Sequence, residues 1–271
     1  MRLLPTSACA IVSALLAIAC GPPDAPDDLD ALTHFLYREW NNQTPSVMED
    51  GVAKLDTLLN ALPLDGGVGG RSFRVTELTR DDLHDVAWPS DRNPKNAIGS
   101  CVARRSKWPI EDNARFIGES DQLDAEPTAK SYVRTFLDPM DPACFIDGTC
   151  PVLLTDNDIK RENTLITVEF TLHKLLRWVP LVTTRRAIAA RSYIDHEFKG
   201  SKSGTSLKQS YSIDVFLGQD DGSTVRYQCS WAETDINLAV DEDLQLSVLV
   251  SATNDALAAT DDAIEKRYHT P

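Results

Sequence analysis

The feature that most constrains the fold is the second half of the chain, where four strand-like segments precede one long helical segment. The four segments, residues 164–172, 185–198, 207–217 and 224–233, are rich in β-branched and aromatic residues. In the first of them, apolar Ile166, Val168 and Phe170 alternate with polar residues, which predicts a strand with one buried face. Residues 220–223, Asp-Asp-Gly-Ser, predict a hairpin between the last two segments. We therefore expect an antiparallel meander.

A long helix is predicted from about Asp241 to Tyr268. Asp241, Glu242 and Asp243 place negative charge at its N-terminal end, and Lys266 and Arg267 place positive charge at the other, as the helix dipole favours. A stripe of mostly small residues would let the helix lie close to a sheet: Leu249, Ala252, Ala256, Ala259 and Ala263. A meander followed by one long helix, over residues 160–268, resembles the helix-grip arrangement of START-like and polyketide-cyclase-like domains. The resemblance implies an α+β fold and an apolar small molecule held between sheet and helix.

The first half predicts two helices, residues 28–43 and 46–62, which form an antiparallel hairpin. Ser46 and Glu49 have capping-box spacing at the start of the second helix, and Pro63 follows its end. From 71 to 155 many prolines predict short strands and long loops. Residues 29–271 are thus expected to form a single α+β domain, with a helical hairpin (29–63), a loop-rich part (71–155) and a sheet with its C-terminal helix (160–271).

The N-terminus predicts export. Arg2 and the apolar residues 10–19 have the order of a secretory signal peptide, residues 1–19. Residues 15–21, Leu-Leu-Ala-Ile-Ala-Cys-Gly, resemble the lipobox of bacterial lipoproteins, which implies lipidation of Cys20. Gly21 after the cysteine implies transfer to the outer membrane of a Gram-negative-type envelope. Ala17 stands where the lipobox has leucine, so cleavage after Ala19 and simple secretion is the alternative. Residues 20–28 are expected to form an acidic, proline-rich tether.

The cysteines fit this compartment. Removal of the signal peptide leaves five of them, and acylation of Cys20 leaves four that can pair in an oxidising environment. The short spacing of Cys144 and Cys150 around an Asp-Gly turn favours one disulfide there and a second between Cys101 and Cys229, although four cysteines allow three connectivities. No Cys-x2-Cys pair is present and no histidine lies near Cys144 and Cys150 in the sequence, so structural disulfides are favoured over a metal site.

Charge narrows the choice of partners. The formal net charge of −14 argues against a nucleic-acid-binding protein, which needs a basic surface. One stretch of 18 residues without Asp or Glu departs from the acidic average. Its five basic residues predict a contact face for lipid A phosphates, acidic peptidoglycan or an acidic protein, or else an ordinary solvated sheet face: Lys174, Arg177, Arg185, Arg186 and Arg191.

Catalytic motifs are incomplete. The sequence has no His-Glu-x-x-His, Gly-x-Ser-x-Gly or Walker A motif. Residues 202–205, Lys-Ser-Gly-Thr, resemble a motif of penicillin-binding proteins, but their nucleophile motif Ser-x-x-Lys is absent. We therefore expect no cofactor or metal, and a non-catalytic, membrane-anchored binding or structural domain. The alternatives are an envelope hydrolase that uses His173 or His196 with a distant carboxylate, and an assembly subunit of an envelope complex.

Overall fold

The computed structural model describes residues 21–64, 71–162, 167–181, 184–236 and 241–270. The predicted signal peptide, Cys20 and Ile166 lie outside these residues. The described strands form one antiparallel sheet of nine strands in the order β1-β2-β9-β8-β6-β5-β4-β3, with β7 paired to β8. The strands are β1 (Arg71–Val75), β2 (Ile98–Ser106), β3 (Ala129–Asp138), β4 (Val152–Glu162), β5 (Thr167–Pro180), β6 (Arg186–Tyr193), β7 (Phe198–Lys199), β8 (Thr205–Gly218) and β9 (Thr224–Ile236).

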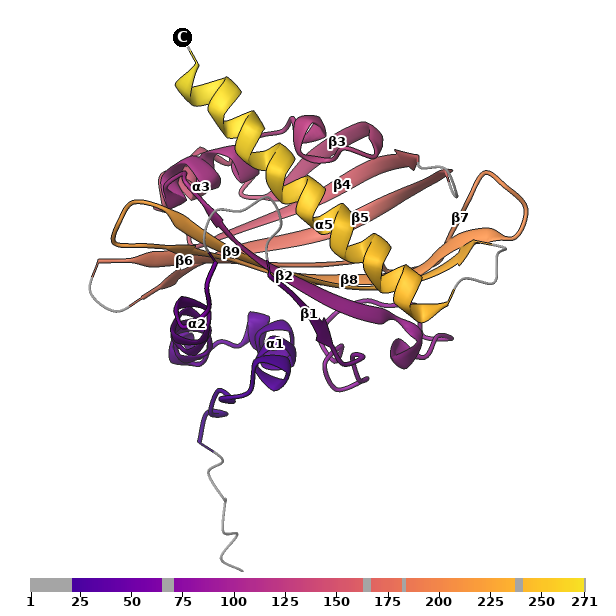
Figure 1. Cartoon of the computed structure of the whole chain (residues 1–271), viewed down its shortest axis with the longest axis horizontal. Coiled ribbons are helices and arrows are strands. Elements are labelled where there is room, and N and C mark those ends of the chain that lie inside the picture. The colour runs from indigo at the N-terminus through magenta and orange to yellow at the C-terminus, as the bar shows by residue number, and fades with distance from the viewer. Residues whose placement is uncertain (1–20, 65–70, 163–166, 182–183, 237–240, 271) are drawn as a thin grey trace, which may run out of the picture.

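Helices cover both faces of the sheet (Figure 1). On one face, which we call the outer face, side chains such as Ala189, Val215 and Cys229 pack against α1 (Leu29–Arg38) and α2 (Pro45–Asn60). On the other, the inner face, Leu176, Ile188 and Phe216 pack with α3 (Ile110–Gly118), α4 (Ala143–Ile146) and the end of α5 (Glu242–Ile264). A π-helical turn, η4 (Glu265–His269), extends α5, and 3-10 turns occur at η1 (Glu39–Asn41), η2 (Pro94–Asn96) and η3 (Leu123–Ala125). The predicted α+β helix-grip arrangement, with its N-terminal helical hairpin and antiparallel meander, is confirmed.

Local signals explain several element ends. Asp241 caps α5 by accepting a hydrogen bond from the backbone N–H of Leu244 at 2.8 Å. Gly222 has a φ of +79°, which allows the tight turn between β8 and β9. The capping box predicted at Ser46 is wrong, because α2 begins one residue earlier, at Pro45, and its N-cap Thr44 makes no side-chain capping bond. A proline in the first turn has the right φ and lacks an N–H that would need a partner, so it starts the helix itself.

The part from 71 to 155 is more regular than the proline content predicts. It contains β1, β2 and β3, of 5, 9 and 10 residues, the start of β4, and the helix α3, which was not predicted. Several of its prolines lie at the ends of elements: Pro109 and Pro142 are the N-caps of α3 and α4, and Pro94 begins η2. These three prolines mark the starts of helices, whereas Pro89 lies in the irregular segment between β1 and η2.

Two disulfides have the pairing favoured from the sequence. Cys101 and Cys229 join directly paired residues of β2 and β9, 128 residues apart in the sequence, and both are buried. Cys144 and Cys150 close a loop around α4 with a sequence separation of 6. Within the described part of the chain, no helix has both the length and the apolar character needed to cross a bilayer.

Candidate functional site

The centre of the inner face is polar. Asp214 on β8 lies 3.3 Å through Oδ2 from the ammonium group of Lys174 on β5. Beside this pair, the hydroxyls of Ser192 and Ser212 lie 2.8 Å apart. The side chain of Asp214 is 7% exposed and that of Lys174 is 21% exposed. A charged pair is thus held under cover in the middle of a sheet face.

Only one of the two carboxylate oxygens of Asp214 has a partner among the described residues. Its Oδ1 atom is buried and has no hydrogen-bond partner among the described residues. Burial raises the pKa of Asp214, and the nearby Lys174 ammonium opposes this rise. Leaving a buried acceptor unpaired costs about 1–3 kcal/mol, and more for a charged group. The geometry therefore offers an acceptor for a hydroxyl or amine that approaches the inner face.

An apolar cluster adjoins this pair. Ile159, Val168, Phe170, Ile194 and Leu207 form a small buried core, against which Leu172 packs. Lys174, Leu172 and Phe170 occupy alternate positions of β5 and therefore share the inner face, with steps of about 7 Å. A polar anchor and an apolar surface thus lie next to each other on β5.

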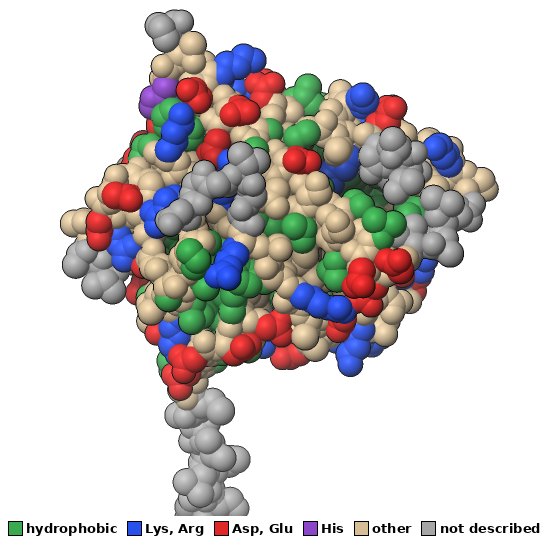
Figure 2. All heavy atoms as spheres, viewed as in Figure 1, with side chains coloured by type: hydrophobic (Ala, Val, Ile, Leu, Met, Phe, Trp, Pro, Cys, Tyr) green, Lys and Arg blue, Asp and Glu red, His purple; other side chains and the backbone are tan. Residues whose placement is uncertain are grey.

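Helix α5 seals only part of the inner face. Its buried residues are Thr253, Leu257, Ala263 and Ile264, all in the second half of the helix. Asp261 in this half forms an ion pair with Arg226 at 3.0 Å. In the first half no described residue is buried, and Leu244 and Val248 are about half exposed, at 52% and 48%. Figure 2 shows hydrophobic and charged side chains intermixed on the side of the molecule that carries α5. The first half of α5 is thus the less tightly packed part.

The predicted stripe along α5 is only partly right. Ala263 is buried, but Ala252 is exposed. The side that packs inward instead runs through Thr253, Leu257 and Ile264. Helix α5 packs mainly against β2 and η3, and these contacts, rather than small residue size, decide which of its residues are buried.

The five basic residues of residues 174–191 do not form one surface. Lys174 and Arg186 lie on the inner-face side, where Arg186 pairs with Glu111 at 3.3 Å and lies over the ring of Trp178. The others turn to the outer-face side. Arg177 donates to the carbonyl of Trp40, Arg185 pairs with Asp56, and Arg191 pairs with Asp85. Each basic group thus has its own partner in a different part of the chain.

His173 lies on the outer-face side, and it shares the carboxylate of Asp195 with His196. Nδ1 of His173 is 2.7 Å from Asp156, its Nε2 is 3.6 Å from Asp195, and Asp195 also pairs with His196 at 2.5 Å. The hydrogen bonds and ion pairs shown for His173 and His196 among the described residues reach carboxylates, not a hydroxyl nucleophile. No group of three or more His, Cys, Asp or Glu in the described part of the chain could hold a metal ion. The group formed by Asp156, His173, Asp195 and His196 thus gives each histidine a carboxylate partner, but the described contacts of these histidines include no nucleophile.

Asp214 was missed from the sequence. It stands alone as a carboxylate among Ile213, Val215, Phe216 and Leu217. In a strand, such a residue either breaks the apolar pattern on one face or marks a functional position. This isolated charge in an apolar strand was the feature of the sequence from which Asp214 could have been identified as a candidate site residue.

Because Asp214 is buried, we expect the stability difference between the wild type and Asp214→Asn to depend on pH. Because burial raises its folded pKa above the ordinary value of about 3.9, its contribution to stability is fully present below that value and is lost as the pH rises through the folded pKa. Asp214→Asn, which mimics the neutral acid, should therefore exceed the wild type in stability at neutral pH, and the difference should close on acidification. Urea unfolding of both proteins at a series of pH values measures it. A difference that widens on acidification would contradict this assignment.

Comparisons with known proteins give only distant likenesses. No protein family model matches the chain. No curated protein matches it significantly. Human StAR-related lipid transfer protein 5 is similar in structure with a TM-score of 0.45 and 11% identity, over 83% of this chain and 98% of that one. A STAR-related lipid transfer protein from Xanthomonas axonopodis gives 0.44 and 12%, over 63% and 87%. An aromatase/cyclase from Streptomyces sp. R1128 gives 0.40 and 12%, over 64% and 97%.

Proposed function

We propose that this protein is a lipid-anchored, non-catalytic envelope protein that binds an amphipathic small molecule between α5 and the inner face of the sheet. The observation that carries the proposal is Asp214, a buried carboxylate with one oxygen unpaired among the described residues. The polar end of the ligand, a hydroxyl or amine, donates to Asp214 Oδ1. Its apolar body lies on Leu172, Phe170 and their neighbours.

The packing of α5 supports this location. A ligand on the inner face has to pass the helix, and the first half of α5 has no described residue in the core, while the second half is fixed by Thr253, Leu257 and Ile264. Entry therefore requires displacement of the first turns only. Two surface recesses lined by described residues lie elsewhere, one beside Lys54 on α2 and one beside Arg185 and Asp220.

The cellular setting follows from the N-terminus. We place the anchor at Cys20, with the mature protein at the outer membrane of a Gram-negative-type envelope. The two disulfides are consistent with an oxidising compartment. Labelled palmitate incorporated into the wild type but not into Cys20→Ser supports the anchor, and equal incorporation into both contradicts it.

Ligand binding should depend on Asp214. With a fluorescent long-chain amine as the probe and the Cys20→Ser protein secreted in soluble form, Asp214→Leu should weaken binding at least tenfold, because the amine loses its acceptor. A charge-assisted hydrogen bond of about 1.5–3 kcal/mol corresponds to roughly 10- to 150-fold. Titration of probe fluorescence measures the dissociation constant.

The matched control is Asp255→Leu, since Asp255 is exposed on α5. It should leave the dissociation constant unchanged. Equal weakening by both substitutions, or by neither, would contradict a site at Asp214. Circular dichroism of each variant checks that the fold is retained.

A further inference from the structure

The segment that precedes α1 is fixed to α2. Ala25 is 3% exposed and belongs to the outer-face core. Its N–H donates to Asp50 Oδ2 at 3.3 Å, and its carbonyl accepts from Lys54 Nζ. The same ammonium pairs with Asp27 at 2.9 Å. We call Ala25, Asp27, Asp50 and Lys54 the clamp.

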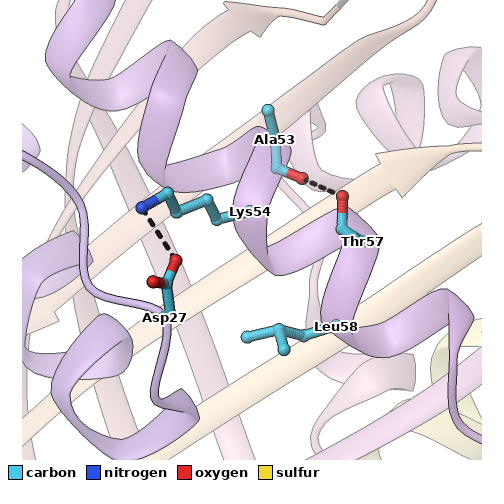
Figure 3. A pocket seen from close by; sticks show the side chains of 5 residues that line it. All are labelled: Asp27, Ala53, Lys54, Thr57 and Leu58. Atoms are coloured by element: carbon cyan, nitrogen blue, oxygen red, sulfur yellow. Dashed lines mark hydrogen bonds and ion pairs between the residues drawn. The ribbon is translucent and has the colours of Figure 1, made fainter.

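Figure 3 shows the part of the clamp formed by Lys54 and Asp27. Lys54 reaches from α2 across to Asp27, beside a recess that Ala53, Thr57 and Leu58 also line. The hydrogen bond to Asp27 raises the pKa of Lys54, so the lysine stays charged. One side chain thus holds both the carbonyl of Ala25 and the carboxylate of Asp27. Residues 25–27 are therefore part of the folded domain.

The clamp shortens the free part of the tether. Five residue steps separate Cys20 from Ala25, which span at most about 18 Å when fully extended. A domain of this length has a radius of gyration of about 18 Å and hence a diameter of roughly 45 Å. The reach of the tether is therefore less than half of the diameter of the domain. A domain held at Ala25 cannot turn its far side to the surface that holds Cys20.

Charge does not provide this orientation by itself. Asp24 and Asp28 are exposed beside the clamp, and Asp27 within the clamp is exposed as well. Acidic groups are repelled by anionic headgroups, so this side of the domain would not adhere to a membrane on its own. The direction has to come from the tether.

We propose that the clamp holds the α1–α2 side of the domain toward the bilayer and turns α5 and the inner face toward the aqueous compartment. This inference rests on the lipid anchor of the proposed function. Figure 1 shows the arrangement on which it depends, with α1 and α2 on the side where the described chain begins and α5 on the opposite side of the sheet. The ligand is therefore exchanged with the aqueous side, not with the leaflet that holds the anchor.

Energy transfer in vesicles tests the orientation. The full-length acylated protein is placed in phosphatidylethanolamine–phosphatidylglycerol vesicles with an acceptor dye on the headgroups. A donor dye is attached through an unnatural amino acid either at Asn60, exposed at the end of α2, or at Asp255, exposed on α5. Transfer from position 60 should be several-fold greater than from position 255.

Release of the clamp should reduce this difference. In Asp50→Ala/Lys54→Ala the free chain extends to Asp28, the N-cap of α1, and its reach grows from about 18 Å to about 28 Å. The ratio of the two transfer efficiencies should then move toward one. Lys107→Ala, which removes an exposed ion pair with Glu265 far from the tether, should not change it.

The outcomes separate the two proposals. Protein that does not float with the vesicles contradicts the anchor and the orientation together. Protein that floats but gives equal transfer from both positions, or the same ratio with and without the clamp, contradicts the orientation alone. Probe binding by the soluble Cys20→Ser protein tests the ligand site independently of either result.

Discussion

Replacement of Cys101 and Cys229 by alanine should lower the free energy of unfolding by about 5 kcal/mol. The disulfide closes a loop with a sequence separation of 128, and the chain-entropy relation gives about 4.9 kcal/mol for a loop of that length. Loss of packing adds to the effect, because both cysteines are buried in the outer-face core. Urea unfolding of the oxidised wild type and the double variant, compared at equal pH, measures the difference.

The second disulfide is the control. Cys144 and Cys150 have a separation of 6, for which the same relation gives about 2 kcal/mol. The Cys144→Ala/Cys150→Ala protein should therefore lose less than half as much stability. If the two double variants lost equal amounts, the entropic explanation would be wrong.

The second large effect is expected at Arg191. Its side chain is 1% exposed, and it donates to both carboxylate oxygens of Asp85, at 2.8 and 3.0 Å, and to the carbonyl of Tyr37. Its guanidinium also lies 5.3 Å from the ring centroid of Trp40. Asp85→Ala leaves this charge buried without its carboxylate and should cost about 3–5 kcal/mol, measured by urea unfolding.

A second substitution distinguishes the destabilisation caused by an unpaired buried charge from the stabilisation that the ion pair itself provides. Arg191→Met in the Asp85→Ala background should recover much of the lost stability, because the buried charge is gone. Glu265→Ala, which breaks the exposed pair with Lys107, should leave the unfolding midpoint unchanged. A double variant no more stable than Asp85→Ala would show that the loss came from packing around residue 85.

Local periodicity predicted much of the fold. Leu32, Leu36 and Trp40, and then Val52, Leu55 and Leu59, repeat at helical spacing, and all six are buried against the sheet. The alternation of Val168 and Phe170 with polar residues likewise predicted the inner-face side of β5. These elements can be predicted from the sequence because buried residues recur at regular spacing along a short stretch of chain.

The partners of charged residues could not be predicted in this way. Arg177, Arg185 and Arg191 read as one local basic run, yet their partners lie 137, 129 and 106 residues away in the sequence. Such pairs form only after α1, α2 and the segment around Asp85 have packed on the sheet. The Lys174–Asp214 pair, across three strands, has the same origin. Sequence spacing therefore indicates where charges lie, but the tertiary fold decides what they meet.

Native mass spectrometry of the secreted Cys20→Ser protein tests the central claim most directly. The claim predicts an additional mass that remains under native conditions, leaves on denaturation, and is reduced or absent in Asp214→Leu but retained in Asp255→Leu. A wild-type protein that carries no such mass and binds no long-chain amine or alcohol added to it would contradict a ligand site on the inner face.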